Sequence, residues 1–220
     1  MKILKILLIL LPLFLFKNES AKDYYFQLAD LRDSIIFKYE CEADATKTEY
    51  WKLTSNKNTL ITEAYNNDFE KYEFFQEEFT ENGSKVLMFV SYHKNETDEI
   101  EVANRTIKES DVFKWDTKDD YHYSAVYNDL TYGQVSFSKH RTFIKEAIIS
   151  ILGTNHNVLK FKGTYRTKIP NANYDDEYIQ YSYYAKGLGL VKMEKVYPNS
   201  KTVMLELTEI IIKADWDEKH

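Results

Sequence analysis

Apolar and polar residues alternate at every second position along most of this chain, which is the period of a β-strand that buries one face. In residues 35–42, Ile35, Phe37, Tyr39 and Cys41 fall on one face of the predicted strand, and most residues between them are charged. This register places Cys41 in the core, where a thiol behaves as a small apolar group and not as a nucleophile. The pattern is typical of half-buried antiparallel strands.

The same alternation, together with β-branched and aromatic residues, predicts strands along the rest of the chain. They cover residues 49–54, 59–64, 72–79, 85–92, 100–107, 121–127, 134–137, 159–162, 178–184 and 203–208. Short polar connections between roughly ten strands favour an antiparallel meander, which protects its edges by curling into a barrel or half-barrel. We therefore predict a mainly β fold of this kind.

Four residues are predicted to form structural turns. Asn82 and Gly83 lie between two predicted strands, and both residue types tolerate the positive φ of a tight hairpin turn. Gly187 and Gly189 are expected to form a similar turn before the next strand.

Residues 144–152 fit two interpretations. Ile144, Ala147, Ile148 and Ile151 have helical spacing, but the segment is rich in β-branched residues. Residues 153–157 are typical of a turn that leads into another strand, and we therefore favour a hairpin over a helix.

The N-terminus has the pattern of a secretory signal peptide. Lys2 and Lys5 precede an apolar run of eleven residues, 6–16, and small and polar residues follow it. The run is shorter than the ~20 residues of a membrane-spanning helix. We predict a signal peptide at residues 1–21 and one β-rich domain at residues 22–220, exported to the periplasm or the exterior. An uncleaved anchor is the alternative, and the cleavage position stays open because Glu19 stands where a small residue is preferred.

Charge and cysteine content limit the partners of this domain. The whole chain has a formal net charge of −6, and removal of the signal leaves 26 basic and 34 acidic residues, a net charge of −8. A net acidic surface of mixed charges disfavours nucleic acid and anionic lipid surfaces. Cys41 is the only cysteine, which excludes an internal disulfide. No cysteine directly follows the apolar run, so lipid attachment there is not predicted.

The sequence contains none of the main catalytic signatures, and we predict no catalytic residue, metal site or cofactor. The histidines are scattered, and the acidic runs at 116–120 and 175–177 are expected to be solvated loops. Asp215, Asp217, Glu218 and His220 are expected to belong to a frayed polar terminus. Eighteen tyrosines and thirteen phenylalanines are more informative, because aromatic faces fill cores and also bind sugars and apolar ligands.

Two segments carry a family resemblance. Tyr25-Phe26-Gln27-Leu28 and residues 183–192, YYAKGLGLVK, resemble the opening segment and the late hairpin of poorly characterised exported β domains from Gram-negative envelopes. Gln27 stands where those domains often have proline. Many of them are similar in outline to lipoprotein carriers of the LolA type, and the resemblance implies a curved sheet that holds acyl chains. It transfers no site residue.

These observations favour a non-enzymatic exported domain that binds an apolar or amphipathic ligand, such as a lipid, in a concave sheet. The first alternative is an envelope interaction module with a filled core, whose partner is another protein. A less favoured alternative is a glycoside-active enzyme with two carboxylates in an aromatic cleft.

Overall fold

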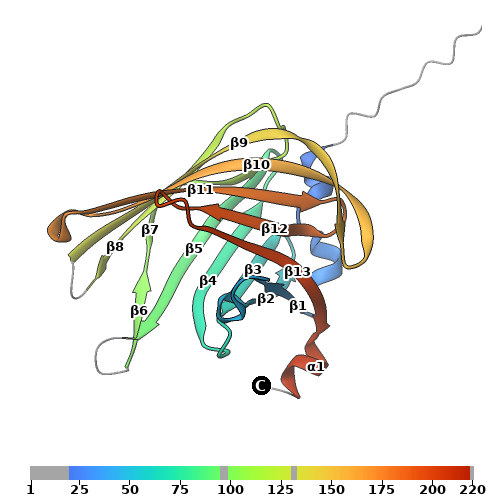
Figure 1. The fold of residues 1–220 in the computed structure, drawn as a ribbon, viewed down its shortest axis with the longest axis horizontal. Coiled ribbons are helices and arrows are strands. Elements are labelled where there is room, and N and C mark those ends of the chain that lie inside the picture. The colour runs from blue at the N-terminus through green and yellow to red at the C-terminus, as the bar shows by residue number, and fades with distance from the viewer. Residues whose placement is uncertain (1–19, 95–98, 130–132, 219–220) are drawn as a thin grey trace, which may run out of the picture.

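The computed structural model describes residues 20–94, 99–129 and 133–218, in which consecutive antiparallel strands wind around one interior (Figure 1). The strands are β1 (Ile35–Glu40), β2 (Glu49–Asn56), β3 (Thr59–Tyr65), β4 (Lys71–Phe79), β5 (Gly83–Lys94), β6 (Ile100–Asn104), β7 (Thr106–Lys114), β8 (Tyr121–Asp129), β9 (Gly133–Ile151), β10 (Thr154–Ile169), β11 (Tyr174–Ala185), β12 (Gly189–Val196) and β13 (Thr202–Ile212). The helical elements are the 3-10 turns η1 (Ala21–Tyr24), η2 (Leu28–Leu31), η3 (Ala45–Lys47) and η4 (Pro170–Ala172), and the α-helix α1 (Lys213–Asp217).

The sheet is a closed barrel, so the prediction of a barrel or half-barrel is confirmed in its closed form. Within the described residues, the strand order is β4-β3-β2-β1-β13-β12-β11-β10-β9-β8-β7-β5-β6, and β4 also pairs with β5. That pairing joins the two ends of the meander into twelve strands, with β6 as an extra strand on β5. Closure removes most unpaired strand edges, as expected for a meander of this length.

The predicted strand at 100–107 is two strands, because the chain changes partner at Arg105. β6 pairs with the far half of β5, whereas β7 pairs with its first three residues and with β8. The backbone N–H of Arg105 donates a hydrogen bond to the carbonyl oxygen of Phe89 at 2.9 Å, which stabilises the bend. Alternation alone carries no signal for such a change of partner.

Residues 144–151 are strand, as the favoured interpretation predicts, and belong to the long β9–β10 hairpin. The turn itself is shorter than predicted. It consists of Leu152 and Gly153, with φ of 52° and 77°, and β10 begins at Thr154. A two-residue turn with positive φ at both positions matches the twist of the flanking strands.

Core side chains lie on both sides of the sheet near β1. Phe37 and Tyr39 face the interior, and Cys41, 5% exposed, lies with them as predicted. On the opposite face, Ile36 packs against Trp216 of α1. The expectation of a frayed C-terminus is therefore wrong up to residue 217, because Trp216 anchors a short helix on the outer face of the barrel; His220 lies outside the described residues.

The predicted turn residues differ in their backbone geometry. Gly187 and Gly189 have φ of 78° and 95° in the β11–β12 connection. Asn82 and Gly83 do not have the positive φ expected of them. Gly83 instead begins β5, where a Cβ would lie 2.1 Å from the carbonyl oxygen of Phe113, so the close approach of β7 requires glycine there.

In the part of the chain that the structure describes, none of the helices has the length and apolar character needed to cross a membrane.

Candidate functional site

A cavity of about 390 Å³ lies inside the barrel. Its walls come from β2 to β5 and from β7 to β12, whose side chains point alternately inward and outward. Small barrels fill their interior with side chains, whereas larger ones enclose ligand cavities. The volume falls within the range of small-molecule sites.

The segment that follows η1 forms one wall of this cavity. Tyr25 and Phe26 line it, and Tyr25 packs against Phe113 with 4.6 Å between ring centroids. The hydroxyl of Tyr25 donates a hydrogen bond to a carboxylate oxygen of Glu77 at 2.8 Å. Figure 1 shows η1 and η2 in blue at one side of the barrel. The opening segment is therefore built into the interior by both packing and a buried hydrogen bond.

An aromatic cluster lines the cavity between β4, β5, β8, β9 and β10. Phe75 and Phe89 lie 5.2 Å apart, Tyr123 and Phe137 lie 5.5 Å apart, and Phe137 lies 6.1 Å from Tyr165, all measured between ring centroids. These edge and tilted contacts are favourable for aromatic pairs, and all five residues line the cavity. The cluster supplies the apolar part of the site.

Two cations on β9 point into the same interior. Because side chains alternate along a strand, Lys139 and Arg141 follow Val135 and Phe137 on the inward face, and they are 8% and 2% exposed. Arg141 donates hydrogen bonds to the hydroxyls of Tyr184 and Tyr165. Burial, reinforced by the charge of Arg141, lowers the pKa of Lys139 to about 8.

The pKa of Tyr165 shows the electrostatic effect of these two cations. Burial raises the pKa of its hydroxyl, but the charges of Lys139 and Arg141 outweigh burial and lower the pKa below its ordinary value. By contrast, burial raises the pKa of Tyr121 and Tyr123 on the neighbouring strand. The potential at Tyr165 is therefore positive.

A third cation enters from the bend between β6 and β7. The guanidinium of Arg105 donates to the hydroxyl of Ser91 at 2.6 Å and lies 3.9 Å above the ring centroid of Phe89 and 4.8 Å from that of Tyr127. Among the described residues, no carboxylate forms an ion pair with Arg105, Lys139 or Arg141.

Two carboxylates on β4 face the cavity in different states. Glu77 accepts hydrogen bonds from Tyr25 and Ser84, and burial raises its pKa. Glu73 has no hydrogen bond or ion pair within the described residues, and burial, opposed by Arg105, raises its pKa to about 7. Glu73 therefore changes its protonation near neutral pH.

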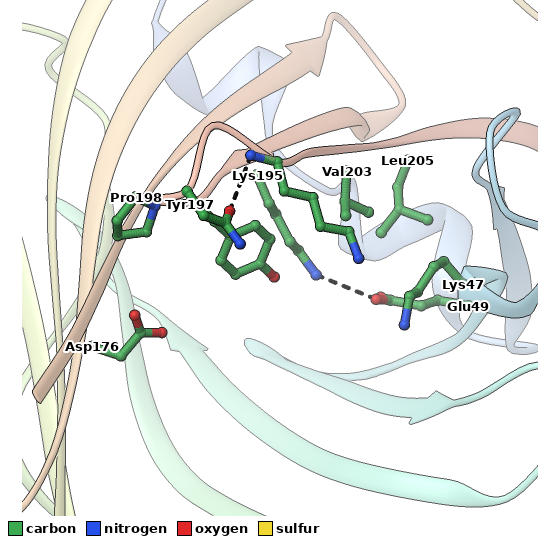
Figure 2. Close-up of a pocket in the computed structure, with 10 residues that line it drawn as sticks. Lys47, Glu49, Asp176, Lys195, Tyr197, Pro198, Val203 and Leu205 are labelled. Atoms are coloured by element: carbon green, nitrogen blue, oxygen red, sulfur yellow. Dashed lines mark hydrogen bonds and ion pairs between the residues drawn. The ribbon is translucent and has the colours of Figure 1, made fainter. Parts of the chain in front are cut away.

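An ion pair separates this cavity from a second hollow of about 430 Å³ beside the β12–β13 turn. Lys195 and Glu49 line both hollows, and their charged atoms lie 3.3 Å apart (Figure 2). Glu49 also accepts hydrogen bonds from Trp51 at 3.1 Å and Tyr72 at 2.9 Å. Burial lowers the pKa of Lys195, but Glu49 outweighs this effect and the pKa is raised. Lys195 is therefore charged at neutral pH.

None of the four predicted turn residues lines this cavity, whereas the opening segment 25–28 and the late hairpin 183–192 both contribute residues to its lining. Of these turn residues, Gly189 lies directly behind the cavity wall, because it contacts Phe26, which lines the cavity. Sequence analysis missed Lys139 and Arg141 because the predicted strand ended at Phe137. Extending its alternation by two more inward positions would have placed both cations inside the barrel.

The histidines and acidic runs do not assemble a metal site within the described residues. His122 and His140 stack across β8 and β9 with ring centroids 4.2 Å apart, and Asp120 lies 3.3 Å from the imidazole of His140. Asp175 forms a two-point contact with Arg166 across the β10–β11 hairpin, so the run at 175–177 lies on paired strand and not in a loop.

Comparison with known proteins gives a structural likeness and no sequence family. No protein-family model matches the chain, and no curated protein matches it. A solved structure from Parabacteroides distasonis, described as a "putative lipoprotein", aligns over 85% of this chain and 97% of its own, with a TM-score of 0.56 and 13% identity. The two chains share a fold.

A second solved structure is similar in the same way. It is an exported protein from Bacteroides fragilis described as having a YmcC-like fold, and it aligns over 82% of this chain and 96% of its own, with a TM-score of 0.52 and 11% identity. At this identity the likeness extends to the fold alone. The resemblance to LolA-type carriers stays a prediction.

Proposed function

We propose that this chain is an exported barrel, acting in the periplasm or outside the cell, that binds an amphipathic ligand inside its cavity. The observation that carries the proposal is the lined interior: aromatic faces and charged groups border the same space of about 390 Å³. Binding sites for small molecules typically combine an apolar lining with a few polar groups that orient the ligand.

The polar groups make a purely apolar ligand a poorer fit. Lys139 and Glu73 face the cavity without an ion-pair partner, and burying such groups against hydrocarbon alone is unfavourable. An amphipathic ligand places its polar group beside them and its apolar part against Phe75, Phe89 and Phe137.

A dye-binding experiment with a cavity-filling variant tests this proposal. The neutral dye N-phenyl-1-naphthylamine should fluoresce on binding to the natural domain, and Val135→Trp should abolish the signal because Val135 faces the cavity. Ser136→Trp is the matched control, since the adjacent residue on β9 points to the other face. Thr167→Trp, also in the lining, repeats the test if Val135→Trp does not fold.

Equal dye binding by the natural domain, Val135→Trp and Thr167→Trp would place the ligand outside the cavity and contradict the proposal. Loss of binding in Ser136→Trp as well would point to a general loss of structure, which circular dichroism measures separately.

An interaction module is the second candidate, and apolar side chains outside the barrel favour it. Ile100 and Val102 on β6 are 65% and 56% exposed, and Leu87 and Met88 on β5 are about half exposed. Exposed apolar residues on a strand outside the barrel suit pairing with another protein. Ile100→Lys with Val102→Lys should release one stoichiometric envelope partner if this hypothesis is right, and should leave dye binding unchanged.

The glycoside-hydrolase hypothesis has one supporting observation. Glu73, with its pKa raised to about 7, lies within electrostatic range of Glu49, and a protonated acid beside an ionised carboxylate is what that chemistry requires. Release of sugar from a glycan that is lost in Glu73→Gln would support it; no release from the natural domain would oppose it.

A further inference from the structure

Four cations and three carboxylates line the barrel interior, and three of the cations form no ion pair within the described residues. The sequence as a whole has a net charge of −6, but Arg105, Lys139 and Arg141 all line the cavity, and none has an ion-pair partner among the described residues. The one ion pair at the cavity, between Lys195 and Glu49, uses a fourth cation. Two carboxylates of β4 interact with these cations electrostatically without an ion pair: Glu73 with Arg105 and Lys139, and Glu77 with Lys139 and Arg141.

Such an arrangement is costly for folding alone. A buried ammonium group without a carboxylate loses its hydration and gains only weaker contacts in return. Lys139 has the rings of Tyr123 and Tyr165 at 5.0 and 5.1 Å, and Arg141 has hydroxyl acceptors, while the Nε of Arg141 is buried with no hydrogen-bond partner. A buried donor without a partner calls for an explanation, and a bound ligand or water is one of them.

Two of the cations contact the aromatic cluster directly. Arg105 lies over Phe89 and 5.7 Å from the ring centroid of Phe137. Phe137 contacts Tyr123, and the ammonium group of Lys139 lies 5.0 Å from the ring centroid of Tyr123. A ligand that packs on Phe137 therefore lies near both Arg105 and Lys139. This juxtaposition suits a molecule with hydrocarbon next to a negative group.

We propose that the cavity binds an anionic amphiphile, whose carboxylate or phosphate group pairs with Lys139 and Arg105 while its hydrocarbon part packs against Phe75, Phe89 and Phe137. This inference rests on the proposed function and names the ligand class of the same cavity. Arg141 contributes positive potential from behind Lys139, held by Tyr165 and Tyr184. Glu73 opposes the anion, and its protonation favours binding.

Three probes with the same ten-carbon chain separate charge from apolar contact: decanoate, decyl phosphate and decanol. Isothermal titration of the natural domain at pH 7 should give dissociation constants for decanoate or decyl phosphate at least about tenfold below that for decanol, because a buried charge-assisted contact contributes on that order. Whichever anion binds more tightly identifies the head group as carboxylate or phosphate.

Variants then assign the preference to named residues. Lys139→Met should raise the dissociation constants for the two anions about tenfold and leave decanol binding unchanged. Lys160→Met is the matched control: Lys160 also lies over two tyrosine rings, at 4.4 and 4.8 Å, but it lies on β10 outside the cavity lining. Arg105→Gln should weaken anion binding in the same direction, and Glu73→Gln should strengthen it severalfold at pH 8.

Three outcomes overturn the inference, and they differ in what they say about the proposed function. Equal affinity for decanol and the anions leaves the apolar site standing and removes the anion preference. An anion preference that survives both Lys139→Met and Arg105→Gln places the charge recognition elsewhere. Binding of none of the probes contradicts the amphiphile site itself, and with it the inference.

Discussion

A buried cation without a carboxylate partner reduces the stability of a fold, and Lys139 has that environment. Its pKa, lowered to about 8 mainly by burial, lies below the value of about 10.4 in an unfolded chain. Between these values the unfolded state holds more protons, so the free energy of unfolding should rise as pH rises from about 8 to about 10. Below pH 8 the destabilisation is complete.

Lys139→Met should therefore stabilise the ligand-free domain at pH 7, by about 1–3 kcal/mol, and should remove the rise above pH 8. Urea unfolding at pH 7 and pH 10 measures both effects. A loss of stability at pH 7 would show that Lys139 supports the fold and is not kept for a ligand.

Glu73 should make stability depend on pH in the opposite direction. Its pKa of about 7 is above the ordinary value, so the native state holds the proton more tightly and stability should fall as pH rises from about 4.5 to 7. Glu73→Gln should flatten this slope and raise stability at pH 8 by about 1–2 kcal/mol.

Glu63 on β3 is the matched control for Glu73. Burial opposes its ionisation, but Lys71 and Lys52, at 2.8 and 3.3 Å, outweigh burial and lower its pKa. Glu63→Gln should therefore reduce stability at pH 8, by up to about 1 kcal/mol for partly exposed pairs. Chemical unfolding at pH 5 and pH 8 distinguishes the two variants, and a decrease for both at pH 8 would contradict the account of Glu73.

At the scale of elements, the β11–β12 turn offers two glycines in nearly the same backbone state. Both have positive φ, but a Cβ at Gly187 has no atom within 4 Å, whereas a Cβ at Gly189 lies 2.4 Å from the ring of Phe26. Gly187→Ala should cost about 1–2 kcal/mol from backbone strain alone. Gly189→Ala should cost more, since it also displaces an aromatic wall of the cavity.

Thermal unfolding of Gly187→Ala and Gly189→Ala, with dye binding on the same samples, tests this difference. Reduced dye binding is expected for Gly189→Ala only. Equal losses of stability would show that the contact with Phe26 adds nothing to the turn.

Much of the strand pattern was predictable from the sequence, because period-two alternation directly reflects which face is buried. Residues 144–151 were assigned correctly on β-branching despite their helical spacing. The division at Arg105 and the helix at residues 213–217 were not predictable in the same way. Both depend on contacts that local alternation does not encode: the pairing of β5 with both β6 and β7, and the packing of Trp216 against Tyr50 and Tyr65.

At the scale of the whole molecule, the closed barrel followed from the number of strands, but the charged interior did not. β9 carries Lys139 and Arg141 on its inward face, where the alternation that predicts strands has apolar residues. The predicted strand therefore ended at Phe137, just before these two cations. Closure then brings β4, β9 and the bend at Arg105 around one cavity, although they are far apart along the chain. No short motif encodes that arrangement.

The most direct test of the central claim is native mass spectrometry of the protein purified from the cells that produce it, followed by extraction of any molecule bound to it. The account predicts one amphipathic molecule per chain in the natural domain and in Ser136→Trp, and none in Val135→Trp. An empty natural domain, or a bound molecule that persists in Val135→Trp, would contradict the claim that the barrel interior is a binding site.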